Sequence, residues 1–231
     1  MYTLYYGRGT ASLAIHAALK EIGAPYELAE IDIEAGQQRS PEYLRINPQG
    51  KVPTLLIDGK PFTESAALMM MLAERHPQSN LAPPSGSLAR AEWYELMVMM
   101  ANSLGNNFRL WFYPSDLHST KEDSTLRSAI QQRIEAVWAT LDARLADNGP
   151  YLLGETFSGA DLMLTMYMRW SRNMPRPATA WPALQKYADM MRARPSWRHI
   201  TEVEERCSRS CLRRSAPNRN SALTRRTTRK N

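Results

Sequence analysis

The first part of the chain alternates strand-like runs with a helical run. Residues 3–6 and 26–33 have the short, alternating pattern of strands, and between them apolar residues recur at helical spacing over 12–22. Gly23-Ala24-Pro25 ends that helix. Such a strand–helix–strand unit predicts two parallel strands joined by a right-handed crossover.

After residue 77 the pattern is helical only. Residues 78–87 contain PPSGS and are linker-like. Beyond them, apolar residues recur every three or four positions over 88–105, 123–147, 161–171 and 182–194. We therefore predict an α/β domain at residues 1–77, a linker at 78–87 and an all-α domain at 88–205. Within the latter, Ser158 and Asp161 form a capping box of S-x-x-D type, for which we predict a structural role.

The segment 47–73 carries the most specific pattern. Val52 precedes Pro53, so the bond between them is one of the few that can be cis. Residues 54–57 and 60–63 are predicted as two strands around an Asp58-Gly59 turn. Pro61 lacks an N–H for a ladder, which predicts an edge strand.

This segment also carries binding chemistry. A cis Val52-Pro53 turn leaves the backbone N–H and C=O of Val52 free to pair with an extended peptide. Glu64-Ser65 begins the next predicted helix, whose N–H groups attract a carboxylate, while Glu64 attracts an ammonium group. A short peptide with a free amino-acid end, such as glutathione, satisfies both.

The order V-P then E-S resembles the glutathione-binding half of glutathione S-transferases. The run LYYGRGTASLAIHAALKEIGAPYE resembles the bacterial beta-like members, and the likeness continues to about Glu205. The resemblance implies a thioredoxin-like N-terminal domain, an all-α C-terminal domain and a two-fold homodimer. It also implies glutathione as co-substrate and a detoxification role. Within this resemblance, Gln49 and Lys51 join Val52, Pro53, Glu64 and Ser65 as expected glutathione-binding residues.

The residue that activates the thiol is less well defined. Beta-like members have a cysteine where this chain has Ala11, which excludes a mixed disulfide at that position. Ser12 is the first candidate because its hydroxyl lies at a predicted helix N-terminus; its alternative role is a plain N-cap. Thr10 has similar chemistry. Tyr6 matches a family tyrosine, but a strand tyrosine is more often part of the core.

The second domain is expected to supply an apolar and aromatic pocket from residues 96–113. Beta-like members have a histidine in this segment, whereas in this chain the next histidine is His118. The spacing of the other histidines, His16, His76 and His199, does not indicate a metal site.

Composition changes this picture little. The chain has 231 residues, a net charge of +6 and two cysteines, Cys207 and Cys211. A disulfide framework is therefore excluded. Residues 206–231 hold nine Lys or Arg and no acid, which leaves 20 basic and 23 acidic residues in 1–205. We expect this tail to be disordered: an artefact of a shifted reading frame, an inert extension, or a basic arm for nucleic acid or a membrane.

The sequence predicts a cytoplasmic enzyme, since neither a signal peptide nor an apolar run of spanning length is present. The expected reaction adds the glutathione thiolate to a small apolar electrophile, with no membrane or nucleic-acid partner unless the tail is real. Two alternatives stay open. One is a non-catalytic ligand carrier or partner-binding scaffold, and the other is a glutathione-dependent peroxidase or dehalogenase.

Overall fold

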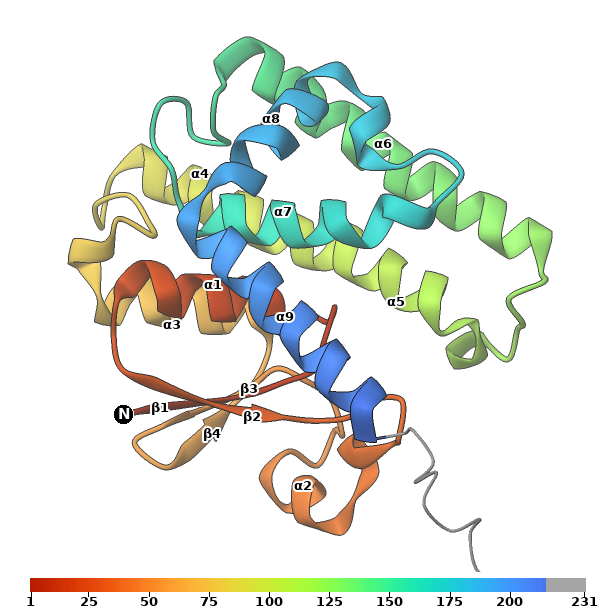
Figure 1. Cartoon of the computed structure of the whole chain (residues 1–231). Coiled ribbons are helices and arrows are strands. Elements are labelled where there is room, and N and C mark those ends of the chain that lie inside the picture. The colour runs from red at the N-terminus through yellow and green to blue at the C-terminus, as the bar shows by residue number, and fades with distance from the viewer. Residues whose placement is uncertain (215–231) are drawn as a thin grey trace, which may run out of the picture.

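A four-stranded sheet forms the N-terminal part of the computed structural model, which describes residues 1–214, with side chains to residue 204. The strands are β1 (Tyr2–Tyr6), β2 (Tyr26–Glu30), β3 (Thr54–Ile57) and β4 (Lys60–Phe62), in the order β2-β1-β3-β4. β1 is parallel to β2 and antiparallel to β3, and β3 pairs antiparallel with β4. Figure 1 shows α1 (Ser12–Ile22) and α3 (Ser65–Arg75) on one face of this sheet.

The edge of the sheet follows from the local sequence. Asp58 and Gly59 both have positive φ, 50° and 82°, as a two-residue hairpin turn requires. Pro61 lies opposite Leu56 on β4, which has no further neighbour in the sheet. The expectation that this proline marks an edge strand is confirmed.

Helices make up the remainder. The N-terminal part also contains the short α2 (Pro41–Ile46). The C-terminal part contains α4 (Leu88–Met99), a π-helical turn η3 (Met100–Gly105), α5 (Asn106–Phe112), α6 (Ser124–Asn148), α7 (Gly159–Trp170), α8 (Pro182–Ala193) and α9 (Pro195–Arg214). A thioredoxin-like domain followed by an all-helical domain is therefore the observed fold. Within residues 1–214, no helix combines the length and apolar character needed to cross a bilayer.

Two helices differ from the sequence pattern. The pattern predicts a helix end at Gly105, yet helical backbone continues through it into α5, and a side chain here would bring its Cβ to 3.0 Å from the Tyr167 hydroxyl. The pattern predicts a turn at Arg194-Pro195, but Pro195 is the first residue of α9, a position that tolerates proline. α9 passes the expected boundary at Glu205 and is described as far as Arg214. The rest of the expected tail, 215–231, lies outside the described residues.

The two parts share one hydrophobic core. α1 is buried along residues 12–19, with the sheet on one side and α7 and α9 on the other. α7 is buried from Gly159 to Met168. α3 reaches α7 at Gly159, where an added Cβ would lie 2.6 Å from the Met69 sulfur. This close packing fixes the N-terminal ends of α1 and α3 relative to the helical part.

The capping box at the start of α7 is confirmed, and Asp161 does more than cap. Its side chain is fully buried and accepts hydrogen bonds from the backbone N–H groups of Ser158 (2.8 Å) and Leu152 (3.0 Å). It also accepts from the hydroxyls of Ser158 and Tyr187, both at 3.1 Å. Asp161 therefore joins the 152 loop, α7 and α8.

We predict that Asp161→Ala lowers the free energy of unfolding by about 3 kcal/mol or more, because it leaves several buried donors without an acceptor. Urea denaturation measures this loss. Asp123→Ala is the matched control, since Asp123 is an exposed N-cap that accepts from Leu126 N–H at 2.9 Å. We expect the control to lose about 1 kcal/mol. Equal losses at the two positions would contradict a special role for Asp161.

His16 is a buried residue of α1. The ring is 2% exposed, its Nε2 is 3.0 Å from the Tyr26 hydroxyl, and the His199 ring centroid is 6.2 Å away. Burial, with the nearby His199 and Lys20, lowers the pKa of His16 to about 4 from its ordinary 6.5. The folded protein therefore holds this imidazole neutral.

We predict that part of the stability is lost as the pH falls from 6.5 to 4. In that window the unfolded chain gains a proton at His16 and the folded chain does not. The shift corresponds to a loss on the order of 2 to 3 kcal/mol. Burial raises the pKa of Asp161 to about 6, which acts in the opposite direction in the same window. Unfolding curves of the wild type and His16→Gln across this range isolate the histidine, and parallel pH profiles would disprove its role.

Candidate functional site

The Val52-Pro53 bond is cis, as its sequence allowed. Two buried side chains support the turn through hydrogen bonds. The Tyr43 hydroxyl and the Asn47 amide donate to the Lys51 carbonyl at 2.7 and 2.8 Å, and Asn47 also donates to the Thr54 hydroxyl at 3.1 Å. Val52 lies beyond the last ladder pair of β1 and β3, Tyr5–Thr54. Its backbone is thus outside the sheet on a braced turn.

Glu64 and Ser65 form the start of α3. Glu64 is exposed and has a φ of 67°, a strained conformation for a residue with a side chain. Strain of this kind is concentrated at ligand-binding positions. The Ser65 hydroxyl donates to the Ala11 carbonyl at 3.2 Å. This bond joins the start of α3 to the loop before α1, which contains the expected thiol-activating residues.

That loop is built around the backbone of Gly7. The Ser12 hydroxyl donates to the Gly7 carbonyl at 3.0 Å and accepts from its N–H at 3.3 Å. The Thr10 hydroxyl donates to the same carbonyl at 2.7 Å and lies 2.8 Å from the Ser12 hydroxyl. Ser12 is 1% exposed, whereas Thr10 is partly exposed. Of the two hydroxyls, that of Thr10 is the nearer to solvent.

The other predicted residues are more scattered. Tyr6 is 5% exposed and packs in the core beside His16, as strand tyrosines often do. The N-cap position of α1 is Ala11, so Ser12 is not a plain N-cap. Gln49 and Lys51 are exposed on either side of Gly50 in the turn.

Helical residues from far along the chain hold the same loop. The Trp170 indole N–H donates to the Gly9 carbonyl at 2.8 Å, and the Gly9 N–H donates to the Glu204 carboxylate at 3.0 Å. Arg169 pairs with the other oxygen of Glu204 at 2.9 Å. Burial raises the pKa of Glu204, opposed by the Gly9 bond and nearby arginines. Both polar groups of Gly9 are thus fixed by α7 and α9.

The charges around the turn include an ion pair near the end of α5. Arg109 forms a two-pronged pair with Asp116 at 2.6 and 3.1 Å and lowers the pKa of that carboxyl group, and the charges of Lys51 and Arg39 lower it further. Burial and then the Glu64 carboxylate raise the pKa of Tyr167 of α7. Because Thr54 lies opposite Tyr5, the turn before β3 and the loop after β1 lie at the same end of the sheet, and Ser65 joins the start of α3 to that loop.

Both parts of the chain match one family. The profile of the glutathione S-transferase N-terminal domain matches residues 1–74, and that of the C-terminal domain matches residues 92–189. Glutathione S-transferase GstA of Escherichia coli O157:H7 is 31% identical over 170 residues, which is 73% of this chain and 81% of that protein. The chain belongs to the glutathione S-transferase family. It is accordingly a transferase enzyme with glutathione as co-substrate.

Other relatives give the same family with different activities in their names. The maleylacetoacetate isomerase of Pseudomonas aeruginosa is 27% identical over 209 residues, 86% of this chain and 93% of that one. A glutathione transferase homologue from Sulfitobacter, crystallised with bound glutathione, superposes with a TM-score of 0.79 at 29% identity, over 87% of this chain and 97% of that one. The beta-class enzyme of Sphingomonas chungbukensis gives 0.77 at 28% identity, over 87% and 98%.

An aromatic cluster lies next to the loop of this transferase. Phe108 and Tyr167 are stacked with centroids 6.2 Å apart, and Trp170 meets Phe108 edge-on at 5.6 Å. Phe112 and Tyr113 are 40% and 44% exposed at the end of α5. The expected apolar pocket thus divides: Phe112 and Tyr113 remain accessible, while most of the residues before them are core. The buried members are Leu96, Met97, Met100, Leu104, Phe108 and Trp111.

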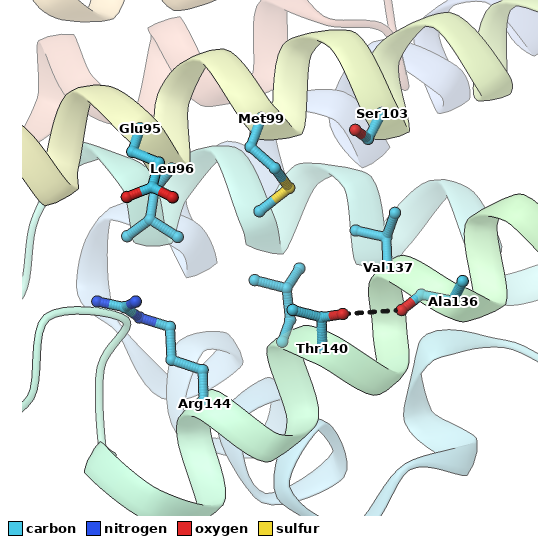
Figure 2. Close-up of a pocket in the computed structure, with 9 residues that line it drawn as sticks. Glu95, Leu96, Met99, Ser103, Ala136, Val137, Thr140 and Arg144 are labelled. Atoms are coloured by element: carbon cyan, nitrogen blue, oxygen red, sulfur yellow. Dashed lines mark hydrogen bonds between the residues drawn. The ribbon is translucent and has the colours of Figure 1, made fainter.

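A cavity of about 400 Å³ lies elsewhere, between α4 and α6. Figure 2 shows Glu95 and Met99 on α4 facing Val137, Thr140 and Arg144 on α6. None of the predicted glutathione-binding or thiol-activating residues lines it, although Leu96, Met99 and Ser103 belong to the segment expected to supply the apolar pocket. This cavity is therefore separate from the site formed by the turn and the loop.

Proposed function

We propose that this transferase binds glutathione between the Val52-Pro53 turn and the start of α3, and adds its thiolate to a small apolar electrophile. The observation that supports this most is the hydrogen bond from Ser65 to Ala11, because it joins an amino-acid-binding helix start to the loop that would meet the sulfur. The braced turn leaves the Val52 backbone to pair with the cysteinyl backbone.

The charged groups suit the ends of this tripeptide. We assign the exposed Glu64 carboxylate to the γ-glutamyl ammonium group, and the free backbone N–H groups at the α3 N-terminus, which include that of Ser65, to the adjoining carboxylate. At the other end, Lys51 and Gln49 would meet the glycine carboxylate. Phe112, Tyr113 and Trp170 would contact the electrophile.

Thr10 is the hydroxyl we assign to the thiolate. The Gly7 carbonyl accepts hydrogen bonds from both Thr10 and Ser12. One of these bonds can therefore break while the other keeps the loop in place. Thr10 is the more exposed of the two and can turn its proton toward the sulfur. Ser12 then keeps the loop in place. The α1 N-terminus adds its positive dipole end, and each donor lowers the thiol pKa.

We predict that calorimetry detects glutathione binding and that the bound thiol has a lower pKa than free glutathione. Thr10→Val, which keeps the shape and removes the donor, should raise that thiol pKa by about one unit. The ultraviolet absorbance of the thiolate against pH measures it. Thr10→Ser is the matched control and should behave like the wild type. Tyr6→Phe should leave turnover nearly unchanged, because this ring lies in the core.

The alternatives give different results in the same titrations. Absence of binding at millimolar glutathione would favour a partner-binding scaffold. Tight binding of S-hexylglutathione with an unshifted thiol pKa would favour a ligand carrier. An unchanged thiol pKa in Thr10→Val would overturn the assignment of Thr10 alone. Peroxidase or dehalogenase activity would use the same thiolate and differ only in the electrophile.

The proposal includes a homodimer and a cytoplasmic location. Leu88, Tyr94 and Val98 of α4 are 87%, 38% and 51% exposed, which gives the surface of this helix an apolar character that a second copy would cover. A cytoplasmic location suits a reaction that consumes glutathione in its thiol form.

We expect Val98→Glu to convert the dimer into a monomer, because a charge would be buried at the interface. Sedimentation velocity measures the change. Ala146→Glu, at an exposed position near the end of α6, is the matched control for an added charge and should remain dimeric. A wild type that sediments as a monomer at all concentrations would contradict the proposed dimer.

A further inference from the structure

The hydroxyl of Tyr167 on α7 is a buried polar group that the fold leaves unpaired. The residue is 4% exposed, and within residues 1–204 its oxygen has no hydrogen-bond partner. Buried hydroxyl groups are nearly always paired, because removal of water from an unpaired one costs free energy. This oxygen is nevertheless not one of the fully enclosed polar atoms that lack a partner. The small exposed part of the residue therefore includes the hydroxyl, which can reach a bound molecule.

Gly105 provides the space for this hydroxyl. It is the last residue of the π-helical turn η3, and such turns are common at functional sites. A Cβ at this position would lie 3.0 Å from the Tyr167 oxygen, which is closer than nearly all side-chain contacts in proteins. A larger residue at position 105 would therefore displace the hydroxyl or cover it.

The ring of Tyr167 lies next to the groups that hold the loop before α1. It meets the Trp170 ring edge-on, with the centroids 5.2 Å apart, and the Trp170 indole bonds to Gly9, the residue before Thr10. Burial, and after it the Glu64 carboxylate, raise the pKa of Tyr167. The hydroxyl therefore keeps its proton at neutral pH, and α7 presents it near both the start of α3 and the loop before α1.

We propose that Tyr167 is a catalytic residue of this transferase and that its hydroxyl donates a hydrogen bond to a carbonyl oxygen of the electrophile. The inference rests on the proposed function, because it concerns the molecule that the glutathione thiolate attacks. It narrows that molecule to ketones and aldehydes in which a carbon–carbon double bond is conjugated to the carbonyl group. A fixed neutral donor suits an oxygen on which negative charge develops during the reaction.

The chemical step is a conjugate addition. The thiolate sulfur forms a bond to the β-carbon, the π pair of the carbon–carbon double bond moves between the α-carbon and the carbonyl carbon, and the carbonyl π pair moves onto the oxygen. The Tyr167 hydroxyl stabilises this enolate oxygen and keeps its own proton. Solvent then supplies a proton to the α-carbon, and the carbonyl group forms again. The hydroxyl thus acts only where the electrophile has an oxygen to receive the charge.

Tyr167→Phe tests this inference on the full chain, because it removes the hydroxyl and keeps the ring that stacks on Phe108. Turnover is measured with two electrophiles that share a phenyl group: benzylideneacetone, which has a conjugated carbonyl group, and benzyl chloride, which has no oxygen. We expect kcat/KM for benzylideneacetone to fall about tenfold or more, as for the loss of one donor to an oxyanion. For benzyl chloride it should stay within about twofold of the wild type, and calorimetry should give an unchanged affinity for glutathione.

Tyr151→Phe is the matched control, because it removes a hydroxyl from a partly buried ring that packs on Phe157 in the segment before α7. It should leave the turnover of both electrophiles unchanged. Three results would overturn the inference: an equal fall with both electrophiles in Tyr167→Phe, as a purely structural tyrosine would give, unchanged turnover of benzylideneacetone in that variant, or a wild type that converts benzyl chloride only. Absence of glutathione binding to the wild type would instead overturn the proposed function.

Discussion

The arrangement of the site depends on the backbone N–H and C=O groups of Gly9. Its carbonyl accepts from Trp170 and its N–H donates to Glu204, so a short loop of the N-terminal domain is fixed by the helical domain. Because Thr10 and Ser12 follow directly, the position of both hydroxyls is set by α7 and α9 as well as by the sheet. Removal of water from Glu204 has a cost in free energy, and the Arg169 pair offsets it.

This dependence explains which parts of the protein its sequence predicts. The strand–helix–strand unit, the Asp58-Gly59 turn and the Ser158 cap each rest on residues within a few positions of one another, where backbone geometry alone selects the residue type. The Val52-Pro53 turn and Glu64-Ser65 belong to the same class. Their order along the chain is what predicts a peptide-binding site at this end of the sheet.

The contacts that position the loop have no such local signal. Gly9 is 161 residues from Trp170 and 195 from Glu204, and neither a tryptophan nor a glutamate in an amphipathic helix indicates a distant partner. The helices that were missed show the same limit. Glycine and proline usually end helices. Here Gly105 is needed inside helical backbone because the Tyr167 hydroxyl lies close to it, and Pro195 is the first residue of α9, where proline is tolerated.

Ala11 takes part in the site through its backbone and not through its side chain. The backbone of Ala11 still accepts from Ser65, so the connection to α3 needs no particular side chain at this position. The loop therefore has no thiol of its own. In the proposed function the sulfur comes from the bound peptide, and its stabilisation falls to hydroxyl groups and the α1 N-terminus, which are neutral donors and act best where water is excluded.

Arg169 supports this loop through a buried acid. One of its nitrogens pairs with Glu204 at 2.9 Å, and the other oxygen of Glu204 accepts from the Gly9 N–H. Without Arg169 the Glu204 carboxylate would lose its ion pair at a buried position, which costs more free energy than an exposed pair would. The position of the loop before α1 therefore depends on a charged residue of α7 that does not contact the loop itself.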